Sequence, residues 1–161
     1  MIVETPWRNR SPVMGTMKNW CLQYECIKCC LNTKMPLSTS DIEGIRGLGF
    51  AEEFFVTKKD GEVRLKNLNG RCVFHNGQRC TIYNDRPEGC RLYPAVFDEN
   101  KGRTVLHGYC PQHKKFQLTP NISREVVKLV RKLDAERKRQ LRSVEQYTSK
   151  NQSWIRSRVL G

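Results

Sequence analysis

Eight cysteines in two groups constrain this chain more than any other feature of its sequence. The first group follows the pattern C-x4-C-x2-C-C, and the second group is more widely spaced. Thiolates are soft donors that select zinc or an iron–sulfur cluster over magnesium or calcium. A gap of two residues also lets both sulfurs of Cys26 and Cys29 face one ion. We therefore expect zinc or an iron–sulfur cluster to be bound by eight ligands: Cys21, Cys26, Cys29, Cys30, Cys72, Cys80, Cys90 and Cys110.

The apolar content of the chain favours metal over disulfides. Residues 1–20 contain no apolar run long enough for the core of a signal peptide. No other segment approaches the roughly 20 apolar residues of a membrane span. The sequence thus predicts a cytoplasmic protein without a membrane partner. Because disulfides are rare in the cytoplasm, clustered cysteines there are better explained as metal ligands.

The adjacent pair Cys29 and Cys30 leaves an alternative open. Neighbouring side chains in an extended backbone point to opposite sides. One member of the pair therefore serves a second metal atom or a second iron of a cluster, or it is a free cysteine buried in the core.

Histidines and arginines near the cysteines are further candidates for the site. Cys72-x2-His75 and Cys110-x2-His113 have ligand-like spacing, and His107 lies close by. Spacing alone is a weak motif, so an ordinary surface or hairpin position explains each histidine better. Four arginines next to or near cysteines would neutralise the thiolates, or they belong to the general basic surface: Arg71, Arg79, Arg86 and Arg91.

Several segments match a known cysteine-cluster pattern in both order and spacing. They are ECIKCC with Cys21 upstream, MPLSTSDIEGI, GRCVF, RCTIYNDRPEGCRLYP and GYCP, and they cover roughly residues 20–113. In these segments the chain resembles the YkgJ-type family of zinc- or iron-chelating domains. The resemblance implies that a metal site includes Cys26, Cys29, Cys30, Cys72, Cys80 and Cys90. One longer branch of that family resembles flagellin lysine N-methylases with an iron–sulfur cluster.

The remaining pattern predicts an α+β fold of short elements. Helix-capping residues at 38–40 and glycines at 47 and 49 bound a short helix. Turn residues predict hairpins over residues 53–67, 72–83 and 95–110. One or two helical turns follow Pro87. We expect an N-terminal arm over residues 1–19, a metal-binding domain over 20–115, and a basic helix with its tail over 116–161.

The C-terminal region differs from the rest in period and charge. Apolar residues recur from Ile122 to Val144 at steps near 3.5, which predicts a helix from Asn121 to about Tyr147. The chain has a net charge of +13, and residues 121–161 contribute +7 of it. Such charge favours polyanionic partners. The candidate RNA-binding residues are Lys128, Arg131, Arg137, Lys138, Arg139 and Arg142.

Two functions follow from these expectations. The first is a structural metal-binding module that docks its basic helix on RNA or on a ribonucleoprotein such as the ribosome. The alternative is that the basic side chains of that helix form an ordinary solvent-exposed face. The second function is an iron–sulfur enzyme, or an enzyme subunit, related to flagellin lysine N-methylases. Against an enzyme, the chain has no glycine-rich loop for a nucleotide or S-adenosylmethionine, and no Ser/His/Asp constellation stands out.

Overall fold

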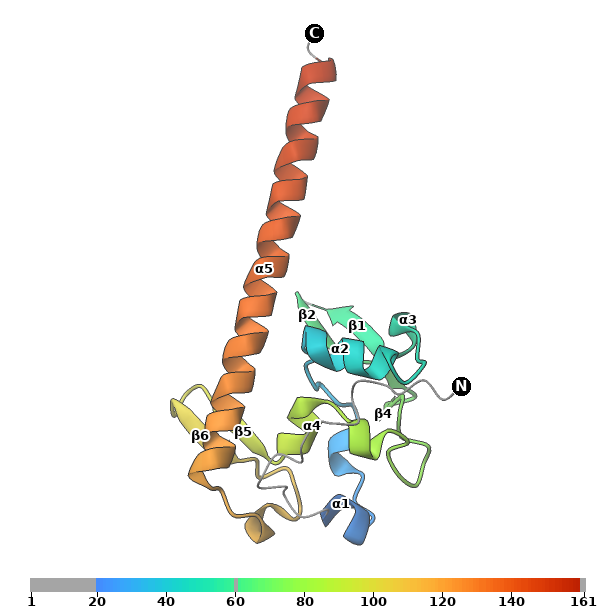
Figure 1. Ribbon diagram of the computed structural model, residues 1–161, viewed down its shortest axis with the longest axis vertical. Helices are drawn as coiled ribbons and strands as arrows, with labels where there is room; N and C mark the ends of the chain where they lie inside the picture. The colour runs from blue at the N-terminus through green and yellow to red at the C-terminus, as the bar shows by residue number, and fades with distance from the viewer. Residues whose placement is uncertain (1–19, 60, 160–161) are drawn as a thin grey trace, which may run out of the picture.

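The computed structural model describes residues 20–59 and 61–159 (Figure 1). The expected arm over residues 1–19 lies outside the described residues. The α-helices are α1 (Trp20–Gln23), α2 (Thr39–Arg46), α3 (Glu52–Phe55), α4 (Glu88–Leu92) and α5 (Pro120–Val159). The 3-10 helices are η1 (Lys28–Cys30), η2 (Tyr83–Asp85) and η3 (His113–Lys115).

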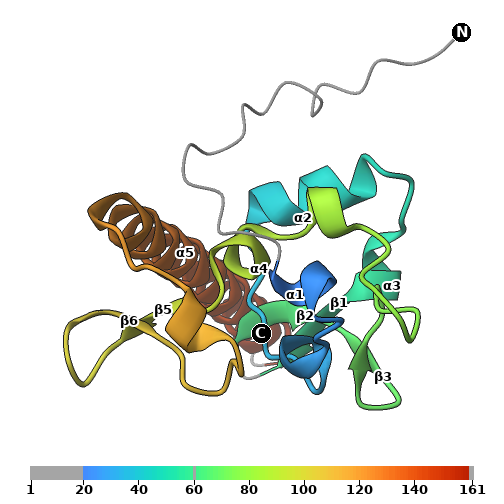
Figure 2. The same cartoon turned by 90° about the horizontal axis from the view of Figure 1, so that it is seen from below.

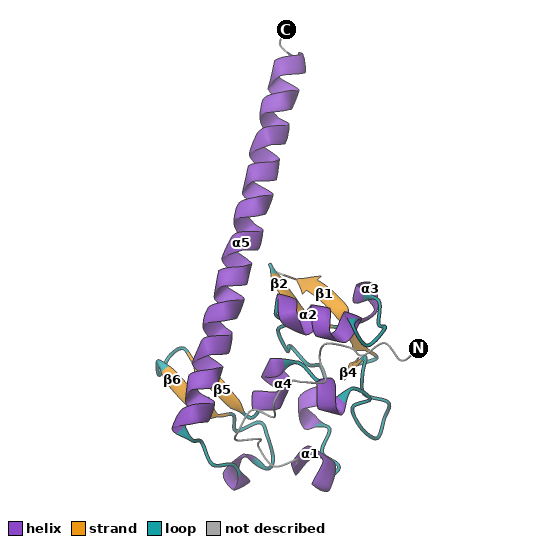
Figure 3. Ribbon diagram, in the orientation of Figure 1, coloured by secondary structure: helices purple, strands orange, loops and turns teal. Residues whose placement is uncertain are grey.

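The strands pair only with their neighbours along the chain. They form three two-stranded antiparallel sheets, from β1 (Val56–Lys59) with β2 (Glu62–Leu65), β3 (Asn67–Leu68) with β4 (Arg71–Cys72), and β5 (Ala95–Asp98) with β6 (Arg103–Leu106). Figure 3 shows these strands as small separate ribbons around the short helices. Isolated two-stranded sheets are marginally stable alone. The predicted α+β class is confirmed, and such a domain needs other contacts to hold its elements together.

The hairpin expected over residues 72–83 is confirmed only at its turn, because Asn76 and Gly77 turn the chain inside a single antiparallel bridge and no strands flank it in this fully described segment. Asn69 and Gly70, both with positive φ, make the tight turn between β3 and β4, so Cys72 ends that hairpin. Residues 73–80 form a loop that is closed by one bridge between His75 and Cys80. The Asn76 side chain accepts the backbone N–H groups of residues 78 and 79 inside this loop. The hairpin expected over 53–67 begins later than predicted, because residues 52–55 form α3.

The other local expectations are confirmed. Helix α2 begins with a capping box, in which Ser38 and Asp41 satisfy each other's backbone N–H groups. Helix α4 follows Pro87, and β5 and β6 form the third hairpin. Helix α5 has 40 residues and runs beyond the expected end at Tyr147.

Two apolar clusters form the core. The larger cluster lies between α2, α3, β2 and the loop after β4, and contains Ile45, Phe55 and Phe74. The smaller cluster joins α5 to β5 through Ala95, Ile122 and Val126. Helix α4 lies between α5 and α1 (Figures 1 and 2). Within the described residues, no helix is both long and apolar enough to cross a membrane.

Candidate metal centre

The first cysteine group lies on α1, η1 and the turn between them. The backbone N–H of Cys26 donates to the carbonyl oxygen of Cys21 at 2.9 Å, which closes the turn after α1. The thiol of Cys29 is hydrogen-bonded to the thiols of Cys21 and Cys30. Cys30 also packs against the larger apolar cluster. The fold therefore brings this group together around Cys29.

The second cysteine group joins the first through α4. Cys72 ends β4, and Cys80 lies at the bridge that closes the following loop. Cys90, in α4, interacts electrostatically with Cys72, Cys80 and Cys29. Segments far apart in the sequence thus place their thiols in one neighbourhood.

Cys110 reaches the first group from the turn before η3. Its thiol is buried and interacts with those of Cys21 and Cys26. Two cation–π contacts hold this turn against the N-terminal segment. The Lys115 ammonium lies 3.7 Å from the ring centre of Tyr24, and the Lys28 ammonium lies 5.4 Å from the ring centre of Tyr109.

Burial and neighbouring thiols raise the pKa values of Cys21, Cys29 and Cys90. The hydrogen bond from Cys21 acts to lower the pKa of Cys29, but the hydrogen bond with Cys30 and burial outweigh it, and that pKa rises to about 12. The hydrogen bond with Cys29 raises the pKa of Cys21. Burial raises the pKa of Cys90 well above 9.0. These thiols are protonated at neutral pH in the metal-free protein, so metal binding must release protons.

Arg86 is the arginine that faces the thiols. Its guanidinium lies 3.8 Å from the ring centre of Tyr83 and donates to the Tyr83 carbonyl oxygen at 2.6 Å. Its charge acts to lower the pKa values of Cys21, Cys80 and Cys90, although burial and the other thiols outweigh it. A fixed cation at this position favours the thiolate forms that bind metal.

The donors suit zinc or an iron–sulfur cluster, although they do not form a finished coordination site. Eight thiols in one neighbourhood are the soft donor set that these groups require. Within the part of the chain that the structure describes, no three His, Cys, Asp or Glu side chains are placed to hold one metal ion. Binding therefore requires thiol side chains to turn toward a common point.

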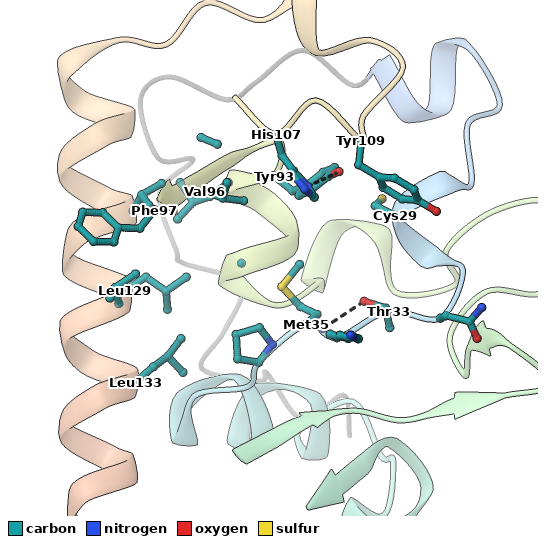
Figure 4. Close-up of a pocket in the computed structure, with 18 of the residues that line it drawn as sticks. Cys29, Thr33, Met35, Tyr93, Val96, Phe97, His107, Tyr109, Leu129 and Leu133 are labelled. Carbon is teal, nitrogen blue, oxygen red and sulfur yellow. Dashed lines mark hydrogen bonds between the residues drawn. The ribbon is translucent and has the colours of Figure 1, made fainter. Parts of the chain in front are cut away.

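A pocket of about 400 Å³ adjoins the cysteines (Figure 4). Its walls are largely apolar, with Leu133 of α5 facing Met35 across the space. Cys29 lies near the end away from Leu133, where Tyr93 Oη and His107 Nδ1 are 3.1 Å apart. The volume falls in the range of small-molecule sites. Sequence patterns did not reveal this pocket, because its lining comes from four separate segments.

The candidate RNA-binding residues do not share one face of α5. Lys128, Arg131, Lys138, Arg139 and Arg142 are exposed and lie within an arc of about 100° at 100° per residue. Arg137 lies on the other side of the helix and pairs with Glu62 of β2 at 3.3 Å.

Comparison with known proteins gives two matches. A relative is the uncharacterized protein MJ0661 of Methanocaldococcus jannaschii, 31% identical over 94 residues, which cover 53% of this chain and 52% of the relative. The chain thus spans about half the length of the curated relative that it matches. No solved structure matches the chain. The model of the CxxCxxCC family, described as "Putative zinc- or iron-chelating domain", matches residues 20–121, which include all eight cysteines. The chain therefore belongs to the CxxCxxCC family.

Proposed function

We propose that this chain is a structural metal-binding module that docks its basic helix on RNA or on a ribonucleoprotein such as the ribosome. Its eight thiols would hold zinc or an iron–sulfur cluster. A bound metal would tie together α1, η1, β4, α4 and the turn before η3, and so supply folding free energy that three small sheets lack. The family description supports the metal, and α5 supports the partner.

The exposed basic face of α5 is the observation on which the partner depends. Among the described residues, no acid forms an ion pair with Arg131, Lys138, Arg139 or Arg142. Residues 138–147 of the helix are all exposed, and the C-terminal part of α5 projects away from the domain (Figure 1). A row of unpaired cations on a projecting rod suits a polyanion, since phosphates supply most of the affinity in such complexes.

The opposite face of the projecting half is apolar. Leu141, Val144 and Tyr147 are 47%, 63% and 70% exposed. Exposed apolar side chains in a row suit a protein surface rather than bare RNA. A ribonucleoprotein presents both surfaces, so it fits the two faces of α5 better than RNA alone.

Binding of labelled RNA and of purified ribosomes tests this function at several salt concentrations. We expect the combined change of Arg131, Lys138, Arg139 and Arg142 to Gln to weaken binding and to reduce its salt slope by about one unit per lost phosphate contact. The matched control is Arg137→Gln, which removes a cation from the other face. Equal binding by the quadruple variant and the unmodified protein would refute the RNA role.

A second candidate is an iron–sulfur enzyme or enzyme subunit related to flagellin lysine N-methylases. The pocket beside Cys29 favours it, because a substrate there would lie next to the metal centre. Metal and sulfide analysis of protein purified without oxygen separates the candidates. Iron with inorganic sulfide supports the enzyme, whereas zinc without sulfide supports the structural module.

A further inference from the structure

His113 has the hydrogen bonding of a metal-binding imidazole. Its Nδ1 lies 2.8 Å from the carbonyl oxygen of Cys110. A carbonyl oxygen only accepts hydrogen bonds, so Nδ1 must donate, and the neutral ring has an unprotonated Nε2. Histidine ligands of metals are commonly held in this way, with one ring nitrogen donating to a backbone carbonyl and the other facing the metal.

The other two histidines of the chain are held differently. His75 Nδ1 accepts the backbone N–H of Gly77 at 3.2 Å, so the proton of the neutral ring is on Nε2. That ring has no lone pair available for a metal. His107 is exposed, and its Nδ1 bonds to the Tyr93 hydroxyl rather than to a carbonyl. Of the three histidines, all of which are described, His113 alone combines a carbonyl-bound Nδ1 with an available Nε2.

The same turn positions His113 and Cys110. The backbone N–H of His113 donates to the Cys110 carbonyl oxygen at 3.0 Å, so both the ring and the backbone of His113 bond to that oxygen. The Cys110 thiol interacts with those of Cys21 and Cys26. The neighbouring contact of Lys115 with the Tyr24 ring holds η3 beside the segment that follows α1. The turn therefore places Cys110 and His113 beside the segment that contains Cys21 and Cys26.

We propose that His113 Nε2 completes a three-cysteine, one-histidine metal centre with Cys21, Cys26 and Cys110. This inference rests on the proposed metal-binding function and adds a ligand to it. Three thiolates and one imidazole are a common zinc set. Of the remaining thiols, Cys29, Cys72 and Cys80 interact with Cys90, and Cys29 also contacts Cys30 and Cys21.

Cobalt(II) titration of the full metal-free chain, without oxygen, tests this ligand. Cobalt absorption distinguishes mixed sulfur–nitrogen coordination from four-sulfur coordination. We expect the unmodified protein to bind one cobalt with the mixed spectrum. His113→Gln should weaken that site by at least about tenfold and remove the mixed spectrum, while cobalt bound by the other thiols is unaffected.

Two further variants make the result decisive. His113→Cys should restore the weakened site with bands shifted to the longer wavelengths of four-sulfur coordination, which shows that the turn still folds. His107→Gln, the matched control, should leave affinity and spectrum unchanged. Identical spectra and affinities for His113→Gln and the unmodified protein would overturn the assignment of His113 alone. No cobalt binding by the unmodified protein would overturn the proposed metal function, and this assignment with it.

Discussion

The carboxylate of Asp41 joins two helices of the domain. Its Oδ2 accepts the backbone N–H and the hydroxyl of Ser38 at 3.0 and 2.7 Å, at the start of α2. Its Oδ1 accepts the backbone N–H of Glu88 at 2.9 Å, at the start of α4. Asp41 is only 6% exposed. One carboxylate therefore satisfies both helix starts and fixes the position of α4, which contains Cys90.

Asp41→Asn should destabilise the protein more than removal of the cap at Ser38. The amide nitrogen of Asn would face one of the N–H groups that Asp41 now accepts, and a buried donor would lose its partner. We expect a loss of about 2 kcal/mol in the free energy of unfolding, against about 1 kcal/mol for Ser38→Ala. Urea unfolding of the metal-free protein measures both. Glu43→Gln, at an exposed position of α2, is the control and should have little effect. A neutral Asp41→Asn would contradict this account.

The raised thiol pKa values predict how the stability of the metal-free protein depends on pH. Folding raises the pKa of Cys29 from 9.0 to about 12 and also raises that of Cys90. Between these values the folded state holds more protons than the unfolded state, so the free energy of unfolding falls as pH rises above 9. Below that pH this contribution is complete. Urea midpoints measured under reducing conditions at pH 7, 8, 9 and 10 should be level at first and then decline.

Metal-loaded protein is the control for that titration. Thiolates that bind metal have already lost their protons, so its midpoint should not follow the same decline. A metal-free protein that became more stable above pH 9 would show that these thiols are not protonated when buried.

The sequence predicts the type of donor in the candidate metal centre but not the orientation of its side chains. The soft thiol donors are evident from composition, and the family resemblance is confirmed by the match over residues 20–121. The sequence does not predict which ring nitrogen of each histidine carries the proton. The position of that proton depends on whether a carbonyl oxygen or an N–H group lies beside Nδ1, as at His113 and His75, and spacing does not encode that.

Among the elements, α5 divides into a docked half and a projecting half. In the docked half, Lys132 bonds to Ser40 at 2.7 Å and Glu136 accepts the backbone N–H of Thr39 at 2.8 Å. These contacts join α5 to the start of α2. Arg137 makes the next contact, with Glu62. Beyond Arg137, residues 138–147 are all exposed.

Two valines on the same face of α5 provide a matched test of this division. Val126 is 4% exposed and Val144 is 63% exposed. Val126→Ala should cost about 1–3 kcal/mol of unfolding free energy, because it leaves a cavity against β5. Val144→Ala should change it by less than about 0.5 kcal/mol. Thermal or urea unfolding of the two variants measures the difference. An equal cost at Val144 would mean that the projecting half is also packed.

The sequence predicted most helices and strands, because residues within or next to each of them determine where it begins and ends. Capping residues fix α2, Pro87 precedes α4, and the 3.5-residue period marks α5. The second hairpin was placed only in part, because both Asn-Gly pairs, at 69–70 and 76–77, make turns and the strands β3 and β4 flank the first of them. Cys72 and Phe74, which lie between the two turns, enter the larger cluster.

Across the whole molecule, four of the eight candidate metal ligands are associated with one of the two cores. Cys30, Cys72, Cys80 and Cys90 belong to the larger cluster or pack against it. The smaller cluster, between α5 and β5, contains no cysteine. Metal loss should therefore weaken the two clusters unequally.

Chelation followed by hydrogen exchange checks this expectation. We expect amides of α2, β2, β4 and α4 to exchange faster after metal removal, because the metal contributes to their folding free energy. Amides of β5, β6 and the docked half of α5 should change less. Uniform acceleration over both regions would indicate that the domain unfolds as one cooperative unit.

The sequence does not predict how the segments that carry the thiols come together, because these segments lie far apart along the chain. The thiols come from segments separated by up to 89 positions, and hairpin turns or helix caps do not specify how such segments meet. Contacts such as Asp41 to Glu88 and Lys115 to Tyr24 decide it. The division of the chain at residue 115 stays a prediction.

The length of α5 has a mechanical consequence. Forty residues at 1.5 Å each make a rod of about 60 Å, whereas a globular chain of 161 residues has a radius of gyration of about 15 Å. The distal end of α5 and the helix α1, which contains Cys21, lie at opposite ends of the molecule (Figure 1). A partner that binds the distal end of α5 would anchor the protein through this helix. The end that carries the candidate metal ligands would stay in solvent while the helix remains anchored.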